Sequence, residues 1–306
     1  MLNLNTLRQQ QIPVMTEYRA QIPFHILAKP IGPACNLACR YCYYPQGETP
    51  VEKMNESTLE VFICRYIAAQ PASAREINFV WQGGEPLLAG IGFYKKVIAL
   101  QQRYAPDGVT ISNSLQTNAT LLNDAWCRLF RDNNFTIGIS LEGSEDLQNH
   151  HRPGKRGDMG RVFVINIEQA WAQYFTHISA TCVHSARCGT NLVMEPDGKL
   201  YACDHLINSQ HYLGQLANNT LAPAVDSATR LPFGIKKSQR RECQRCSVKI
   251  VCQGGCPAHI NSAGYNRLCS GYYSFFTEIL APLRAWPRNL NGLKAWRADV
   301  MGRFSG

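Results

Sequence analysis

The stretch Cys35-Asn-Leu-Ala-Cys39-Arg-Tyr-Cys42-Tyr-Tyr44 places three thiols at C-x3-C-x2-C spacing. It follows an apolar run from Phe24 to Ala28, which is typical of a strand, and the turn-forming segment 29–33. A four-iron, four-sulfur cluster prefers four protein ligands, so three thiolates leave one iron open to a small-molecule chelate. Open coordination is typical of catalytic metal sites, whereas closed sites are usually structural. The spacing alone also allows a zinc site completed by a distant histidine.

The 306 residues are enough for one large domain or two ordinary ones, and the composition is that of a globular protein. No run of about 18 apolar residues is present, so we expect no membrane span. Residues 1–22 show no periodicity and lack the apolar core of a signal peptide. These features predict a cytoplasmic, reducing location.

Thirteen cysteines are present, and eleven of them have spacings typical of metal ligands. In a large chain without an export signal, metal binding explains such a count better than disulfides do. The formal net charge is +9, and basic residues crowd at Lys236, Lys237, Arg240, Arg241 and Arg245. We interpret this group as a solvated basic face beside anionic clusters, so a nucleic-acid partner is disfavoured.

From Phe24 the chain alternates between strand and helix patterns. We expect strands at 24–28, 77–81, 110–117 and 135–141. We expect helices at 94–104, from Asn123 or Asp124 to Phe130, and between Asn55 or Ser57 and Pro71. Strands separated by single helices imply a parallel sheet, either doubly wound or barrel-like. Functional residues should then lie at the carboxyl ends of the strands.

The ends of the second, third and fourth strands carry polar and glycine residues. The second strand runs into Gln82-Gly83-Gly84-Glu85-Pro86, where paired glycines permit a close backbone approach to a ligand and Glu85 offers a carboxylate to an amine. By itself this segment is equally a simple turn. The third strand ends in Gln116-Thr117-Asn118 and the fourth in Ser140-Leu141-Glu142-Gly143.

The cysteine loop, with Tyr41 before its last thiol, and the glycine segment one strand later resemble the radical S-adenosylmethionine (SAM) enzymes. In that family SAM chelates the open iron of a [4Fe-4S] cluster, and its reductive cleavage releases a 5'-deoxyadenosyl radical that abstracts hydrogen. The resemblance implies that Cys35, Cys39 and Cys42 hold this cluster.

The same resemblance implies contacts with SAM. Gly83, Gly84 and Glu85 match the segment that meets the methionine amine, Ser140 matches a ribose contact, and Arg152 matches an arginine that holds the carboxylate. Gln82 and Tyr44 match positions that line the substrate and cofactor pocket. From the residues alone, Arg152 could be a surface arginine, and the other two could pack the sheet.

The chain after the fourth strand is short for a complete barrel. Each strand-plus-helix unit takes about 30 residues, but only residues 144–181 precede the next cysteine group, with room for a strand at 162–166 and a helix at 167–175. Family members carry strands five and six here, so Lys155-Arg-Gly-Asp-Met-Gly160 resembles the seam of an internal deletion. We therefore predict an α/β fold, a partial (β/α) TIM-like barrel of the radical SAM type shortened by about two strands.

A second array holds eight thiols, enough for two closed sites, at Cys182, Cys188, Cys203, Cys243, Cys246, Cys252, Cys256 and Cys269. The turn Glu195-Pro-Asp-Gly198 predicts a hairpin of 192–194 with 199–202 that brings Cys188 and Cys203 together. The segment from Cys243 to Cys256, considered alone, equally fits a zinc knuckle.

The complete array resembles the SPASM auxiliary-cluster domain, most closely that of anaerobic sulfatase-maturating enzymes. The resemblance implies one cluster on Cys182, Cys188, Cys203 and Cys256 and another on Cys243, Cys246, Cys252 and Cys269. Together with the cluster of the three-thiol loop, the expected cofactors are three [4Fe-4S] clusters and SAM. The expected domains are a lead-in at 1–22, the partial barrel at 23–180, shortened after 143, the SPASM domain at 181–275 and a C-terminal helical tail at 276–306.

Asp204 directly follows Cys203, where a carboxylate can accept a proton; without the family it would be a hairpin aspartate bonded to backbone. The resemblance implies that it is the base when a serine or cysteine of a sulfatase becomes formylglycine, with flavodoxin or ferredoxin as electron donor. Three alternatives stay open: maturation of another ribosomal peptide, an inactive cluster-binding protein that lacks barrel strands and, as the most distant, a zinc-dependent nucleic-acid module.

Three weaker patterns complete the sequence. Cys64 and Cys127 lie in helical segments, where we expect both in the core. Residues 272–283 predict an amphipathic helix whose aromatic side chains pack, and the segment beyond Pro287 is basic without an assigned role.

Overall fold

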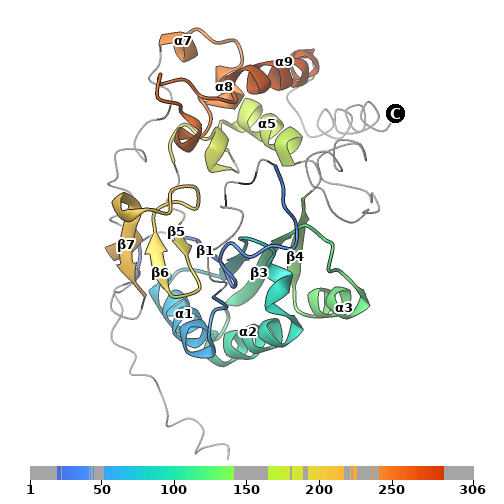
Figure 1. Cartoon of the computed structure of the whole chain (residues 1–306), viewed down its shortest axis with the longest axis vertical. Coiled ribbons are helices and arrows are strands. Elements are labelled where there is room, and N and C mark those ends of the chain that lie inside the picture. Colours follow the sequence, from blue (N-terminus) through green and yellow to red (C-terminus); the bar gives the residue numbers. More distant parts are fainter. Residues whose placement is uncertain are drawn as a thin grey trace, which may run out of the picture. The chain divides into compact units, whose positions relative to one another are not determined.

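The computed structural model describes residues 19–21, 23–40, 42, 44, 52–140, 165–179, 181–188, 192–216, 221, 223–225, 237 and 241–285. The chain forms two compact units (Figure 1). The first contains residues 1–158 and 190–228, and the second contains residues 159–189 and 229–306.

The first unit is built on a seven-stranded sheet with the order β4-β3-β2-β1-β5-β6-β7. Its first four strands along the chain are parallel neighbours: β1 (Ile26–Ala28), β2 (Glu76–Trp81), β3 (Thr110–Thr117) and β4 (Phe135–Ile139). The parallel sheet predicted from the alternating pattern is therefore confirmed for these strands. Their carboxyl ends meet at one edge, as parallel pairing requires.

Helices α1 (Glu56–Ala69), α2 (Ile91–Tyr104) and α3 (Asp124–Asp132) connect these strands, and α1 lies beside α2 in Figure 1. The side chain of Asn55 caps α1 by accepting from the Thr58 N–H at 2.8 Å, which decides between the two predicted caps. Asn123 caps α3 in the same way, because its side chain accepts from the backbone N–H groups of Ala125 and Trp126.

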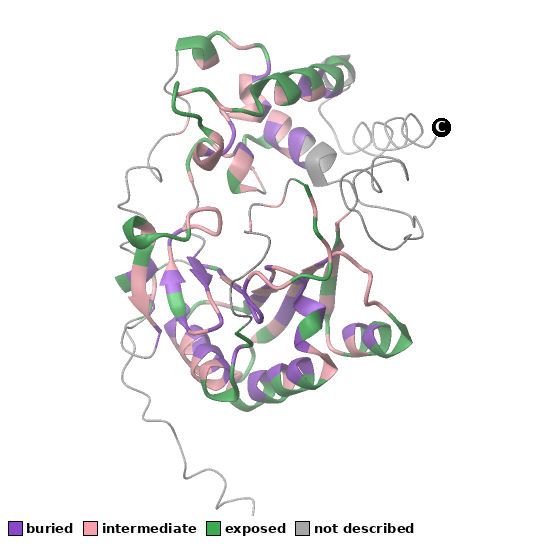
Figure 2. Cartoon of the chain, in the orientation of Figure 1, coloured by how far each residue is buried: buried purple, intermediate pink, exposed green. Residues whose placement is uncertain are grey.

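Aromatic side chains fill the space between the sheet and these helices. Phe62, Tyr66, Phe79 and Trp81 are fully buried, and the rings of Tyr66 and Phe79 lie 4.9 Å apart at 79°. Such edge-to-face packing adds to the free energy gained by burial. Trp81 also donates to Asn113 Oδ1 at 2.8 Å, which ties β2 to β3 just before the glycine segment. Buried residues accordingly follow the inner faces of the helices in Figure 2.

The predicted hairpin is confirmed, but it belongs to this same sheet. Strands β5 (Leu192–Met194) and β6 (Lys199–Tyr201) pair in antiparallel fashion, and β7 (Tyr212–Gln215) continues beyond them. The turn requires Gly198, whose φ of +83° favours glycine. Strand β5 pairs in parallel with β1, so the hairpin extends the sheet that carries the cysteine loop.

Two expectations are wrong. Cys127 is exposed, because α3 buries Trp126 and Phe130, which lie one turn apart, and Cys127 falls outside that narrow face. Residues 165 and 166, expected to end a strand, begin helix α5 (Ile165–Thr176). Cys64 is half-buried. The segments 141–164 and 286–306 lie outside the described residues, and no strand occurs in the described residues between 140 and 192.

The second unit packs α5, α8 (Lys249–Cys252) and α9 (Cys269–Ala285) around a small core, with α7 (Arg241–Gln244) preceding α8. The buried core side chains are those of Ala170, Val248, Val251, Phe276, Ile279 and Leu280. The helix predicted at 272–283 is confirmed and begins earlier, at Cys269, but the expected packing of its aromatic side chains is wrong for Tyr273, which is exposed. No helix among the described residues is long and apolar enough to cross a membrane.

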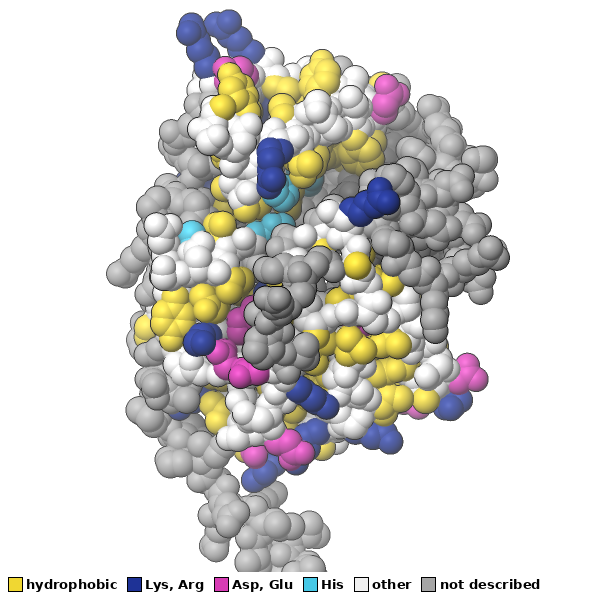
Figure 3. Space-filling view, in the orientation of Figure 1, with side chains coloured by type: hydrophobic (Ala, Val, Ile, Leu, Met, Phe, Trp, Pro, Cys, Tyr) yellow, Lys and Arg dark blue, Asp and Glu magenta, His cyan; other side chains and the backbone are white. Residues whose placement is uncertain are grey.

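The basic group of the sequence is partly exposed and is interrupted by acid, and its Lys237 is half-buried. Arg241 and Arg245 are exposed, and so is Glu242 between them, while Lys236 and Arg240 lie outside the described residues. On the face shown in Figure 3, Lys and Arg side chains stand singly or in small groups, several of them beside Asp or Glu. The exposure of Arg241 and Arg245 agrees with the interpretation of a solvated face, whereas the half-buried Lys237 does not.

Candidate active site

A cavity of about 220 Å³ lies in the first unit where the segments that follow β1, β2, β3 and β4 converge. Its walls include eight of the residues predicted for the site: Cys35, Cys39, Cys42, Tyr44, Gln82, Gly83, Gly84 and Ser140. Four further residues complete it, namely Leu37, Gln116, Thr117 and Asn118. The sequence pointed to the last three only as the end of a strand, and it gave no signal for Leu37.

The three thiols of the loop face this one cavity. Cys35 is exposed, and Cys39 and Cys42 are half-buried. The backbone N–H of Cys42 donates to the Cys39 carbonyl at 3.1 Å, which closes a turn between them. Partial burial raises the pKa of the Cys35 thiol, and the nearby Cys42 adds to this, while hydrogen bonds from Leu37 and Asn118 oppose it. Three convergent thiols beside a cavity fit a four-iron cluster with one open iron.

Gly84 holds the cysteine loop against the end of β2. Its φ is +52°, and a Cβ on this residue would overlap the carbonyl oxygen of Ala34 and lie 2.7 Å from its carbon. The next residue, Glu85, donates its backbone N–H to the same carbonyl at 2.8 Å. Gly83 has a φ of +108° and faces the buried side chain of Lys29, whose Cγ would lie 2.6 Å from an added Cβ. Both glycines are therefore required because other parts of the chain, Ala34 and Lys29, approach their backbone closely. From the sequence, the close approach of a ligand was expected here.

The carboxylate of Glu85 is fully buried beneath the cavity and accepts three hydrogen bonds. Oε1 accepts from Leu87 N–H at 3.0 Å and from Thr117 Oγ1 at 2.8 Å, and Oε2 accepts from Asn118 N–H at 2.8 Å. Burial raises the pKa of this carboxyl, and the three hydrogen bonds oppose the rise. The side chain joins the ends of β2 and β3. The amine contact expected for it stays a prediction.

Lys29, which the sequence assigned only to a turn, supports the site from behind its wall, next to Gly83 and Tyr44. It is fully buried, and its Nζ lies 2.8 Å from Glu195 Oε1 in the β5–β6 turn. The same Nζ lies 4.7 Å from the centroid of the Tyr44 ring, close enough for a cation–π contact. One cation thus links the end of β1, the hairpin and the end of the cysteine loop.

The far wall of the cavity is a paired amide and hydroxyl. Gln116 donates from Nε2 to Ser140 Oγ at 2.8 Å, and both side chains line the cavity. The neighbouring strand leaves room for this amide because position 138 is glycine, where a Cβ would overlap Gln116 Oε1. Arg152, the expected carboxylate contact, lies outside the described residues.

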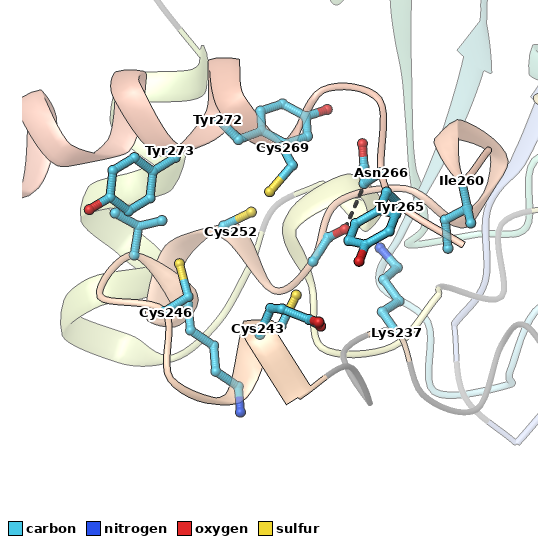
Figure 4. Close-up of a pocket in the computed structure, with 14 residues that line it drawn as sticks. Lys237, Cys243, Cys246, Cys252, Ile260, Tyr265, Asn266, Cys269, Tyr272 and Tyr273 are labelled. Carbon is cyan, nitrogen blue, oxygen red and sulfur yellow. Dashed lines mark hydrogen bonds between the residues drawn. The ribbon is translucent and has the colours of Figure 1, made fainter. Parts of the chain in front are cut away.

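The second unit holds a smaller cavity of about 80 Å³ lined by Cys243, Cys246, Cys252 and Cys269. Figure 4 shows their sulfur atoms turned toward the same space, with Tyr272 and Tyr273 at its edge. Burial raises the pKa of the Cys252 thiol to about 11, and the three other thiols add to this rise. The structure thus brings together the four cysteines that were assigned to one auxiliary cluster.

Three members of the other predicted set also lie in the second unit. Burial raises the pKa of the Cys188 thiol to about 11, with further contributions from the nearby Cys182 and Cys256. The fourth member, Cys203, follows β6 in the first unit, where its thiol donates to Asp204 Oδ1 at 3.8 Å. His205 Nε2 lies 3.8 Å from the other oxygen of Asp204. Asp204 is not among the described residues that line the larger cavity.

Comparison with known proteins connects these sites to a family. The model of the Radical SAM superfamily matches residues 30–175. A serine-type anaerobic sulfatase-maturating enzyme of Klebsiella aerogenes is 58% identical over 390 aligned positions, which cover 99% of this chain and 96% of the relative. Its counterpart in Klebsiella pneumoniae is also 58% identical, with 99% of each chain covered. The structure of anSMEcpe with bound AdoMet has a similar fold, with a TM-score of 0.70 at 22% identity, over 85% of this chain and 97% of that chain.

Proposed function

This chain belongs to the family of anaerobic sulfatase-maturating enzymes, which are radical SAM proteins, and we propose that it oxidises a serine side chain of a sulfatase to formylglycine. The observation that carries the proposal is the 58% identity to serine-type relatives along almost their whole length. The convergence of the three-thiol loop and the glycine segment on one cavity supports it.

The residues around the larger cavity fit a radical SAM cluster and its cofactor. Cys35, Cys39 and Cys42 would supply three thiolates, which leaves one iron for the amine and carboxylate of SAM. When bound, the pair supplies the radical that abstracts a hydrogen atom from the substrate.

The chain's own residues would orient SAM and move one proton. The backbone of Gly83 and Gly84 would face the methionine amine, with Glu85 fixing that segment from below, and Ser140 would hold the ribose. Arg152 would bind the carboxylate, and Tyr44 and Gln82 would shape the wall next to the substrate. Asp204 would take the proton released when the serine side chain becomes a carbonyl.

We infer that the second cysteine array accepts the one electron that remains after the radical has removed a hydrogen atom and Asp204 has taken the proton. One [4Fe-4S] cluster would be held by Cys243, Cys246, Cys252 and Cys269, which gains support from the cavity that they line together. The other would be held by Cys182, Cys188, Cys203 and Cys256, and the proximity of three of these thiols supports it. Together they would form a SPASM domain at 181–275. A cytoplasmic electron donor such as flavodoxin or ferredoxin would supply the electron that cleaves SAM at the first cluster.

The length of the alignment favours a second candidate function, for which we propose an internal deletion. The alignment with the Klebsiella aerogenes enzyme spans 390 positions against 306 residues here, so at least 84 aligned positions have no residue in this chain. If the gap removes contacts to SAM, the chain would be a cluster-binding protein without activity.

One experiment separates these functions. The chain is reconstituted anaerobically with iron and sulfide, then incubated with SAM, a strong reductant and sulfatase peptides that carry serine, cysteine or alanine at the target position. A carbonyl product from the serine peptide, together with 5'-deoxyadenosine, would support the proposal. SAM cleavage without a carbonyl would favour maturation of another peptide. Neither product from a chain with its full iron would favour the inactive protein.

A further inference from the structure

Asn118 reaches the cluster loop from the end of β3. Its Nδ2 lies 3.7 Å from Cys35 Sγ and 2.9 Å from Asn36 Oδ1, so both amide hydrogens have an acceptor. Its Oδ1 accepts from the Thr120 N–H at 3.0 Å and from Thr120 Oγ1 at 2.7 Å. All four hydrogen-bonding positions of this amide are therefore used.

The orientation of the amide follows from its partners. The backbone N–H of Thr120 can only donate, so the atom that faces it must be the carbonyl oxygen of Asn118. The amino group consequently faces Cys35 and Asn36. Asn36 donates back to Thr120 Oγ1 at 2.7 Å, which closes a ring of hydrogen bonds. The backbone N–H of Asn118 is in turn held by the buried carboxylate of Glu85.

We propose that Asn118 is a positioning residue that donates a hydrogen bond to the Cys35 thiolate and so raises the reduction potential of the cluster held by this loop. Donors to a charged sulfur make stronger hydrogen bonds than donors to neutral groups. Reduction adds an electron to the cluster, so a donor to one of its ligands stabilises the reduced form more than the oxidised form. The proposal rests on the cluster assignment of the proposed function, and it does not depend on the sulfatase reaction.

The loop itself supplies a second hydrogen-bond donor to the same sulfur, and this donor differs from Asn118 in that no substitution at position 118 removes it. The backbone N–H of Leu37 lies 3.4 Å from Cys35 Sγ and stays in place whatever residue occupies position 118. Asn118 is 83 positions away from Cys35 along the chain. Its hydrogen bond therefore exists only when β3 is correctly placed, and it is removable by one substitution.

Three variants of the full chain test this assignment. N118D keeps the shape and the acceptor for Thr120 but replaces the donor to Cys35 by a carboxylate oxygen. N118A removes the donor without adding charge. N36A is the matched control, since it opens the ring of hydrogen bonds while the Asn118 amide still faces the sulfur. A chain with C35A, C39A and C42A identifies which spectroscopic signal belongs to this cluster.

The measurement is the midpoint potential of that signal in a redox titration followed by electron paramagnetic resonance, without peptide. We expect N118A to lower the potential, N118D to lower it further, and N36A to leave it unchanged, with the other clusters unaffected. Equal shifts in N118A and N36A, or none in a fully loaded N118D, would overturn the proposal. Failure of N118A to assemble a cluster that N36A assembles would do so too, because Asn118 would then act on loop folding. These potentials can be measured even if the chain does not oxidise sulfatase peptide, so failure of the proposed function and failure of this inference are distinguishable.

Discussion

Replacing Gly84 by alanine should separate the cysteine loop from the sheet. An alanine at the observed φ of +52° costs about 1–2 kcal/mol in backbone strain. Its Cβ would lie 2.7 Å from the Ala34 carbonyl carbon, about 1 Å inside ordinary contact between carbon atoms, and overpacking of this kind costs about 1–3 kcal/mol. The combined cost of about 2–5 kcal/mol destabilises the contact between Gly84 and Ala34, the residue before Cys35. We therefore expect G84A to bind less iron at this loop.

Gly108 provides the matched control. Its φ is +74°, but a Cβ on it would meet nothing within 4 Å, so G108A carries the backbone strain without the collision. Iron per chain after anaerobic reconstitution and thermal unfolding are measured for both variants, with C35A as the reference for an empty loop. We expect G108A to be destabilised and fully loaded, and G84A to approach C35A in iron content. Parental iron content in G84A would refute the role of this contact.

Three further predictions concern groups around the same cavity. K29M should lower the free energy of unfolding by about 3–5 kcal/mol because it leaves Glu195 without its buried partner. Chemical denaturation should show that the double variant K29M/E195L recovers most of the lost stability. A similar loss in the single and the double variant would contradict this prediction. The raised pKa of Glu85 means that the folded chain holds the carboxyl proton more tightly than the unfolded chain, so stability should fall as pH rises from the ordinary pKa of 4.5 through the folded pKa. In urea unfolding of the metal-free chain, E85Q should lose less stability over this pH range than the parent. An equal loss in E85Q and the parent would exclude Glu85 as its source. G138A should displace the Gln116 amide and weaken SAM binding in equilibrium dialysis while iron content stays parental; unaltered binding would remove this pair from the cofactor site.

Local patterns were sufficient for most elements and for the outline of the site. The predicted strand 110–117 is β3, and the helix caps are Asn55 and Asn123, each of which was one of two residues expected to start its helix. Hydrophobic period and capping act within a few residues, so they can be followed along the chain. Parallel pairing then gathers the strand ends at one edge, which is why the glycine segment and Ser140 meet the cysteine loop.

The same kind of pattern is insufficient where burial depends on more than one element. The helical period around Cys127 indicates which residues share a face, but the width of the buried face depends on what packs against it. α3 buries only Trp126 and Phe130 in the structure, so Cys127 is exposed.

The sequence by itself determined the three-thiol loop and the parallel strands that follow it, because spacing and period are local properties of a chain. The group of cysteines around the second cavity was expected only from the resemblance to a known family. Only the tertiary structure decided which distant groups become partners. Lys29 and Glu195 pair across 166 positions, β5 joins β1, and Asn118 reaches Cys35. These contacts depend on strand register and on which side chains arrive together in the interior, where a buried charge or amide is stable only beside its partner.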